Sequence, residues 1–128
     1  MERALLFALA LVLALPVSAR NRDTEEAAID AHVYLSSSAA LRANVLDVQE
    51  EFLPDGTLRI HLLGAAKTSR DTKLRYRVLW FNESGIPIKT VMSTWKPITL
   101  RGRRPFDITG ISPSPAATDY RIEIEPQP

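Results

Sequence analysis

Hydrophobic and polar side chains alternate most regularly over Lys73–Asn82, near the middle of the chain. The apolar residues share one parity: Leu74, Tyr76, Val78 and Trp80. The opposite parity begins with basic residues: Lys73, Arg75 and Arg77. A period of two sustained in this way predicts a β-strand with one apolar face and one charged face. Because the far end is apolar on both faces, we expect the central strand of a small antiparallel β-protein, with Tyr76 and Trp80 in its core.

A β-hairpin is predicted just before this strand. Residues 43–53 alternate imperfectly, and as a strand they would point Leu46 and Val48 inward. A helix is the alternative for this segment, because its apolar residues also recur at helical spacing. Residues 54–57, Pro-Asp-Gly-Thr, are typical of a tight turn, since proline presets φ and Asp-Gly accepts a positive φ. Residues 58–65 alternate again and complete the hairpin.

Turn signals recur at short intervals along the rest of the domain. We expect a tight turn at 82–85, a returning strand over 86–96, a turn over 99–104, and strands over 105–111 and 119–125. The short apolar stretch 32–35 is a candidate edge strand. Six or seven short strands separated in this way predict an all-β fold, a small immunoglobulin-like antiparallel β-sandwich.

The N-terminal segment has a different pattern, an unbroken apolar run over Ala4–Val17. This run is shorter than the roughly 20 residues that cross a bilayer as a helix, and small residues follow Pro16. We therefore predict a signal helix in residues 1–19 that is cleaved after Ala19, with an uncleaved anchor as the alternative. Residues 20–37 are then a flexible leader that includes the candidate edge strand, and residues 38–128 form the folded domain, located in the periplasm.

Composition narrows the chemistry that the chain can perform. It has 128 residues, no cysteine, and 16 basic against 15 acidic side chains. The lack of cysteine excludes disulfides, thiolate metal sites, a cysteine nucleophile and lipidation at a signal cleavage site. The balanced charge gives no overall field that would steer the protein to nucleic acid or to an anionic membrane. We expect membrane contact only if the signal is left uncleaved.

Few residues are candidates for catalysis. His32 and His61 lie in separate predicted strands without metal-ligand spacing, so we expect neither a metal nor another cofactor. The sequence has no Gly-x-Ser-x-Gly motif and no phosphate-binding glycine loop. We expect that the protein is not an enzyme; a hydrolase with a convergent acid–base pair is the remaining catalytic alternative.

The central strand and the residues that follow it resemble the hallmark of the YcfL-like proteins, an envelope family of Gram-negative bacteria without established activity. The matching residues are Leu74-x-Tyr76-Arg77-Val78-x-Trp80-Phe81-Asn82-x-x-Gly85, then Trp95, Gly102, Ser112-Pro113 and Ala117-x-x-Tyr120-Arg121-Ile122. The resemblance implies an immunoglobulin-like β-sandwich exported across the inner membrane, and it supplies no catalytic residues. Two features depart from the family: the cleavage-site cysteine of many members is absent, and Asn82 stands where Asp is usual.

Two groups of residues are candidates for binding a partner. Basic side chains crowd one predicted turn and line one strand face: Arg101, Arg103 and Arg104, and Lys73, Arg75 and Arg77. They would suit an acidic protein, anionic lipid headgroups or lipopolysaccharide, unless Glu123 and Glu125 neutralise the strand face from a neighbouring strand. Trp95, near a strand end, would anchor a partner or stack on a sugar ring; the alternative is a second core tryptophan.

These observations lead to two functional hypotheses. The first is a non-catalytic interaction module of the bacterial cell envelope that holds another envelope protein in the periplasm. The second is a glycan-binding or peptidoglycan-binding module that uses Trp95 and the Arg101–Arg104 turn.

Overall fold

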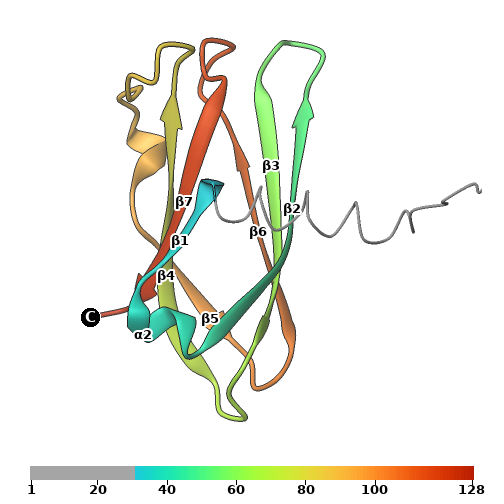
Figure 1. Ribbon diagram of the computed structural model, residues 1–128, viewed down its shortest axis with the longest axis vertical. Helices are drawn as coiled ribbons and strands as arrows, with labels where there is room; N and C mark the ends of the chain where they lie inside the picture. The colour runs from blue at the N-terminus through green and yellow to red at the C-terminus, as the bar shows by residue number, and fades with distance from the viewer. Residues whose placement is uncertain (1–30) are drawn as a thin grey trace, which may run out of the picture.

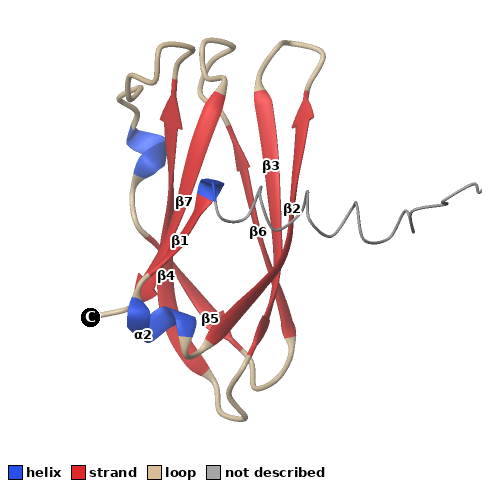
Figure 2. Ribbon diagram, in the orientation of Figure 1, coloured by secondary structure: helices blue, strands red, loops and turns tan. Residues whose placement is uncertain are grey.

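Seven strands form two sheets that pack face to face in the computed structural model, which describes residues 31–128 (Figure 1). The strands are β1 (Val33–Leu35), β2 (Ala43–Phe52), β3 (Leu58–Ala66), β4 (Thr72–Phe81), β5 (Lys96–Leu100), β6 (Pro105–Ile111) and β7 (Asp119–Pro126). Between the strands lie a short helix, α2 (Ser37–Ala40), and a 3-10 turn, η1 (Val91–Ser93) (Figure 2). The predicted β-sandwich is therefore confirmed. The predicted signal helix, its cleavage at Ala19 and the first part of the leader lie outside the described residues.

The sheet orders place the predicted central strand inside a sheet. One sheet has the order β1-β7-β4-β5, and the other has the order β2-β3-β6. The expectation of a purely antiparallel fold was wrong in one place, because β1 pairs with β7 in parallel. After β1 the chain enters α2, which Ser36 caps, and then crosses to the other sheet. No hairpin joins β1 to its neighbour, so no tight turn forces an antiparallel pairing.

The core fills the space between the sheets with residues from the alternating strands. Its largest fully buried side chains are Trp80, Leu58, Ile60, Leu62, Leu74, Leu100, Ile108, Ile122 and Ile124. Trp80 is 2% exposed and lies 6.3 Å from the Tyr120 ring, centroid to centroid. Tyr76 is partly buried and packs against this cluster. The inward parity predicted for the central strand is therefore confirmed.

Strand β2 departs from simple alternation. Its pairing with β3 shifts register between Val45 and Asp47, which marks a β-bulge. Val45 and Val48 therefore both face the core, although they differ in parity, whereas Leu46 is 51% exposed. The prediction of an inward Leu46 was wrong because the bulge inserts one residue and reverses the faces before it. The strand itself is confirmed over the helical alternative.

The predicted returning strand over 86–96 was also wrong. After a tight turn, Pro87 makes one isolated bridge to Phe81, and the chain then leaves the sheet through η1. The hydroxyl of Thr90 caps η1 by accepting a hydrogen bond from the Met92 N–H. The strand on this side of β4 begins only at Lys96, and it includes two residues that were expected in a turn. As a result, β5 covers only the first half of β4.

Candidate functional site

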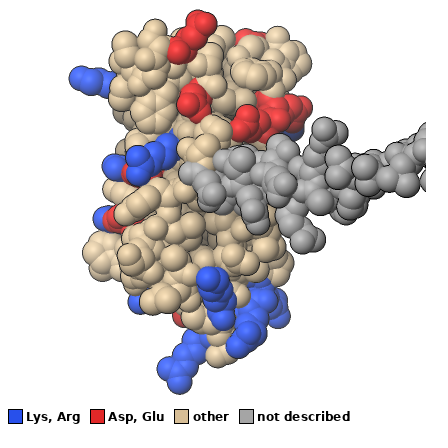
Figure 3. Space-filling view, viewed as in Figure 1, with Lys and Arg blue, Asp and Glu red and all other residues tan. Residues whose placement is uncertain are grey.

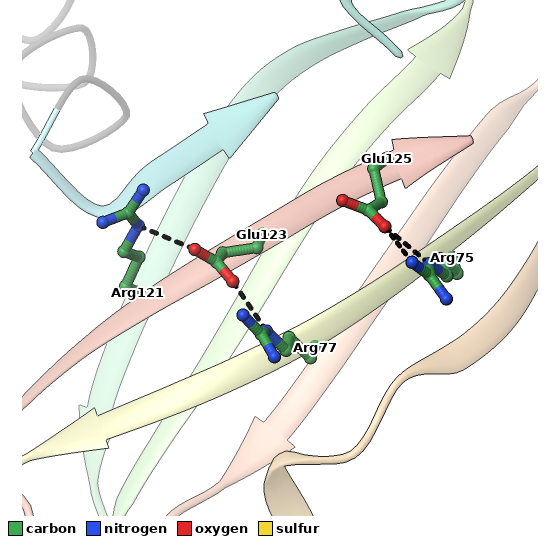
Figure 4. A network of polar contacts seen from close by, with 5 residues as sticks. All are labelled: Arg75, Arg77, Arg121, Glu123 and Glu125. Atoms are coloured by element: carbon green, nitrogen blue, oxygen red, sulfur yellow. Dashed lines mark hydrogen bonds and ion pairs between the residues drawn. The ribbon is translucent and has the colours of Figure 1, made fainter. Parts of the chain in front are cut away.

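Ion pairs neutralise the basic face of the central strand (Figure 4). The Nε of Arg75 donates to Glu125 at 2.7 Å, and the Nε of Arg77 donates to Glu123 at 2.6 Å. Arg121 approaches the second oxygen of Glu123 at 3.3 Å. Because β4 and β7 are neighbours in this register, the expected cross-strand pairing is confirmed. Arg75 and Arg77 are therefore poor candidates for an external anion.

Trp95 lies against the same two arginines. The guanidinium carbons of Arg75 and Arg77 are each 4.5 Å from the centroid of the Trp95 ring, within the range of cation–π contacts. Trp95 is partly exposed and is absent from the buried cluster, so it is not a second core tryptophan. Two guanidinium groups already lie against its ring, which counts against sugar stacking on the same surface.

The turn with Arg101, Arg103 and Arg104 lies at the opposite end of β5 from Trp95. A strand of this length spans about 16 Å at roughly 3.3 Å per residue, so the two halves of the predicted glycan site are not brought together. Arg101 donates to Asp71 at 2.8 Å. The pKa of Asp71 is held below its ordinary value, mainly by the hydrogen bond from the Gly102 N–H and next by the hydrogen bond from Arg101. This turn is bound to the β3–β4 loop rather than to the tryptophan.

A polar cluster joins the two sheets at the start of β7. The Nε2 of His32 lies 2.9 Å from an Asp119 oxygen, and the His32 ring stacks on Tyr120 at 4.3 Å. The Tyr120 hydroxyl donates to Glu50 of the other sheet at 2.8 Å. Burial, followed by this bond to Glu50, raises the pKa of Tyr120. Sequence reasoning missed the cluster because its members are far apart in the chain; His32 and Asp119, for example, are 87 positions apart.

The two histidines are not brought together. His61 lies beside Asp107 at 3.3 Å, on the outer face of the second sheet. Within residues 31–128 no group of three histidine or acidic side chains is arranged to hold a metal ion. The cluster around Tyr120 links the two sheets through the hydrogen bond from Tyr120 to Glu50.

A mainly apolar cleft opens where β5 begins, beside Lys96. Its volume is about 260 Å³, and it lies between β4, the segment around η1 and the free edge of β6. Its lining combines a mostly apolar floor with four polar or charged residues: Tyr76, Val78, Trp80, Met92, Gly110 and Ile111, together with Arg77, Thr94, Lys96 and Thr109. A Cβ placed on Gly110 would lie 3.4–3.5 Å from atoms of Val78, Ile60 and Trp80, so the glycine leaves the floor of the cleft open.

Part of the rim of the cleft, with the residue next to it, is apolar and exposed. Met92 is 44% exposed, Ile111 is 43% exposed, and Val91 beside Met92 is 86% exposed. Sequence reasoning missed this site because residues 86–96 were predicted to be a strand. Two signals were present: adjacent apolar residues in a segment bounded by prolines, and a glycine at an inward position of β6, which marks a close approach or a vacant volume.

Beside the cleft, peptide groups of two strands, β4 and β6, face a side where no neighbouring strand of the described residues pairs with them. The Trp80 carbonyl accepts from the Ile88 N–H on the β5 side, so the peptide groups of Val78 point to the same side. Among the described residues, no strand lies beside Val78 there, because the β4–β5 pairing ends at Tyr76.

On β6, the backbone N–H and carbonyl groups of the even-numbered residues bond to β3. Two hydrogen bonds at the ends of the pairing show this parity: the Ser112 N–H donates to the Leu58 carbonyl, and the Ala66 N–H donates to the Arg104 carbonyl. The N–H and carbonyl groups of Asp107, Thr109 and Ile111 therefore point outward.

The open edge of β5 is different, because proline protects it. In the β4–β5 register, Tyr76 pairs with Lys96, and Pro97 falls at the next position, where its nitrogen faces away from β4. A proline there removes one donor from the free edge, which is a usual protection against strand addition. The β6 edge has a proline only at its first residue, Pro105, so on the side of the sandwich that holds the cleft Asp107–Ile111 is the edge open to pairing.

Comparisons with known proteins identify the family and the fold. A family model described as "Protein of unknown function (DUF1425)" matches residues 20–126. The solved structure of Campylobacter jejuni cj0090 is similar, with a TM-score of 0.62, 18% identity, and coverage of 74% of this chain and 97% of that chain. A DUF1425 family member from Shewanella sp. pv-4 has a TM-score of 0.60 and 22% identity, with coverage of 67% and 79% respectively. No curated protein matches the chain significantly.

Residues 31–128 contain no candidate for a membrane-spanning helix. Among the described residues, no helix combines the length and the apolar character needed to cross a bilayer.

Proposed function

We propose that this chain, which belongs to the DUF1425 family, is a non-catalytic interaction module of the bacterial cell envelope that holds an extended segment of another envelope protein. The observation that carries the proposal is the apolar cleft beside the free edge of β6. Export to the periplasm is part of the proposal, and it is supported by the apolar run over Ala4–Val17 and the small residues before Ala19. The YcfL-like motif residues support the same envelope location.

The edge and the cleft suit one kind of ligand. The outward peptide groups of Asp107, Thr109 and Ile111 offer donors and acceptors for an added antiparallel or parallel strand. In a strand, alternate side chains point to the same face, so one apolar side chain of the added segment reaches the cleft at Gly110. Backbone hydrogen bonds would then supply affinity, and the cleft would select for an apolar residue.

Site-specific photo-crosslinking tests this proposal in the intact chain. A benzophenone amino acid at Thr109 places the reactive group on the free edge of β6, and the same group at Thr99 places it on β5, the edge protected by Pro97. We expect discrete adducts with one envelope protein from position 109 and none from position 99. Equal adducts from both positions, or none from either in any growth condition, would contradict the proposal.

A second variant pair tests the hydrogen-bonding mode on the partner so identified. Thr109→Pro removes an outward N–H without removing a bond to β3, and Thr99→Pro does the same on β5. We expect Thr109→Pro to weaken binding at least tenfold, while Thr99→Pro stays within twofold of wild type. Equal affinities of the two variants would show that the segment is not held as an added strand.

A further inference from the structure

Basic side chains gather at one end of the sandwich, the lower end in Figure 3. They come from residues 67–73 and from the β5–β6 turn: Lys67, Arg70, Lys73, Arg101, Arg103 and Arg104. The same two segments contain one acidic side chain, Asp71, which is engaged by Arg101 and Gly102. Since the whole chain has a net charge of only +1, its charges are segregated rather than uniformly basic.

Backbone contacts lock the two loops of this end together. The Arg103 N–H donates to the Thr68 carbonyl at 2.9 Å. A Cβ on Gly102 would lie 2.1 Å from the Ser69 carbonyl oxygen, so only glycine permits the observed approach of the two backbones. Arg103 has a φ of 54°, a left-handed conformation that disfavours residues other than glycine. The cations therefore project from a fixed base, which lowers the ordering cost of binding.

An exposed leucine adjoins the basic loops. Leu41 is 76% exposed at the junction between α2 and β2. Lys67 holds this junction against the basic end, through its N–H to the Arg42 carbonyl at 2.8 Å and its Nζ to the Ala40 carbonyl at 3.0 Å. Clustered cations with an adjoining exposed apolar side chain are typical of surfaces that enter the headgroup region of anionic membranes.

We infer that this end docks the sandwich onto an anionic lipid bilayer, with its cations on headgroup phosphates and Leu41 in the interfacial layer. A bilayer fits better than a single acidic protein segment, because the cations come from two separate segments, residues 67–73 and the β5–β6 turn, and so spread over the whole end of the sandwich. The docking goes beyond the proposed function and does not depend on it, since the cleft and the β6 edge are formed by other residues. A basic side chain near such a surface contributes about fivefold to partitioning.

Vesicle sedimentation with the full chain tests the inference. Vesicles of phosphatidylcholine alone report any binding by the N-terminal apolar run, and vesicles containing phosphatidylglycerol add the electrostatic part. We expect at least tenfold stronger binding to the anionic vesicles, with a steep decline as salt is raised. Arg70→Glu with Arg104→Glu should reduce that binding at least twentyfold. Lys89→Glu with Lys96→Glu changes the net charge equally away from the basic end and should cost less than threefold.

Further readouts separate docking from general charge effects. Leu41→Ser should weaken anionic binding about fivefold without changing its salt dependence, because it removes only the apolar contact. Millimolar glycerol phosphate should not compete, since a single phosphate cannot engage several loops. Equal losses in the two double variants, no preference for anionic vesicles, competition by glycerol phosphate, or tighter binding to an acidic protein such as polyglutamate would each overturn the inference. The salt dependence of wild-type binding tests the docking even if a variant fails to fold.

Discussion

Replacing Trp95 with alanine separates a structural role for this residue from a binding role. The ring contacts two guanidinium groups at 4.5 Å, and the Arg75 and Arg77 side chains are only 29% and 34% exposed. Two partly desolvated cation–π contacts contribute about 1 kcal/mol each. Partial burial of the tryptophan side chain, roughly 100 Å² at 25 cal/mol per Å², adds up to about 2.5 kcal/mol. These contributions sum to about 4.5 kcal/mol, an upper limit because the unfolded chain already buries part of the ring, so we expect Trp95→Ala to lower the free energy of unfolding by about 3 kcal/mol.

Thermal and urea denaturation followed by circular dichroism measure this loss. A loss of about 3 kcal/mol corresponds to a fall in Tm of roughly 12–20 °C in a domain of this size. A double-mutant cycle of Trp95→Ala with Arg77→Met isolates the stacking contribution, for which we expect a coupling of about 0.5–1 kcal/mol. Trp95→Phe, which keeps an aromatic face, should lose about half as much as Trp95→Ala.

Two results would refute this reasoning. A loss below about 1 kcal/mol for Trp95→Ala would mean that the ring contributes little packing in solution. A coupling indistinguishable from zero would mean that the contact with Arg77 is not formed. Either result would mean that the arginines do not occupy the face of the Trp95 ring, and sugar stacking on that face would again be a candidate function.

Three other measurements test single features of the fold. Gly64→Ala should cost about 2–3 kcal/mol in urea denaturation, because its Cβ would lie 2.4 Å from a Phe106 atom and 2.7 Å from a backbone oxygen, whereas Gly110→Ala, with contacts of 3.4–3.5 Å, should stay within about 1 kcal/mol. Val45→Ser should cost about 1–2 kcal/mol and Leu46→Ser less than about 0.5; the reverse order would exclude the bulge. The raised pKa of Tyr120 favours the native state fully below pH 10, where unfolded tyrosine is neutral, and this contribution is lost as the pH rises further. The urea midpoint should therefore fall more steeply above pH 10 in wild type than in Tyr120→Phe. Equal slopes would show that the Tyr120 hydroxyl is not buried.

Strands with uninterrupted alternation could be predicted from the sequence. In β4 and β7 every second residue is apolar, so both the strands and the faces that they bury follow from the period. The Arg75–Glu125 and Arg77–Glu123 pairs could be predicted for the same reason, because the two charged faces had to meet once the strands became neighbours.

Departures from the period could not be predicted. The bulge after Val45 leaves no composition signal, and it reversed the face expected for Leu46. Residues 86–96 contain enough apolar side chains for a strand, yet Pro87 and the Thr90 cap direct them out of the sheet. Because residues 86–96 leave the sheet, the cleft forms beside β4 and Trp95 lies against Arg75 and Arg77. Both features depend on contacts between distant segments, which the local signals, the adjacent apolar residues of 86–96 and Gly110, do not specify.

Amide hydrogen exchange along β6, read by NMR, tests the open edge most directly. In the free protein at low concentration, we expect rapid exchange at Asp107, Thr109 and Ile111, and protection at Ile108 and Gly110, whose amides bond to β3. With the crosslinked partner segment bound, the three fast amides should become protected. Uniform protection over residues 107–111 in the free monomer would mean that the edge is already paired, and it would contradict the proposed mode of binding.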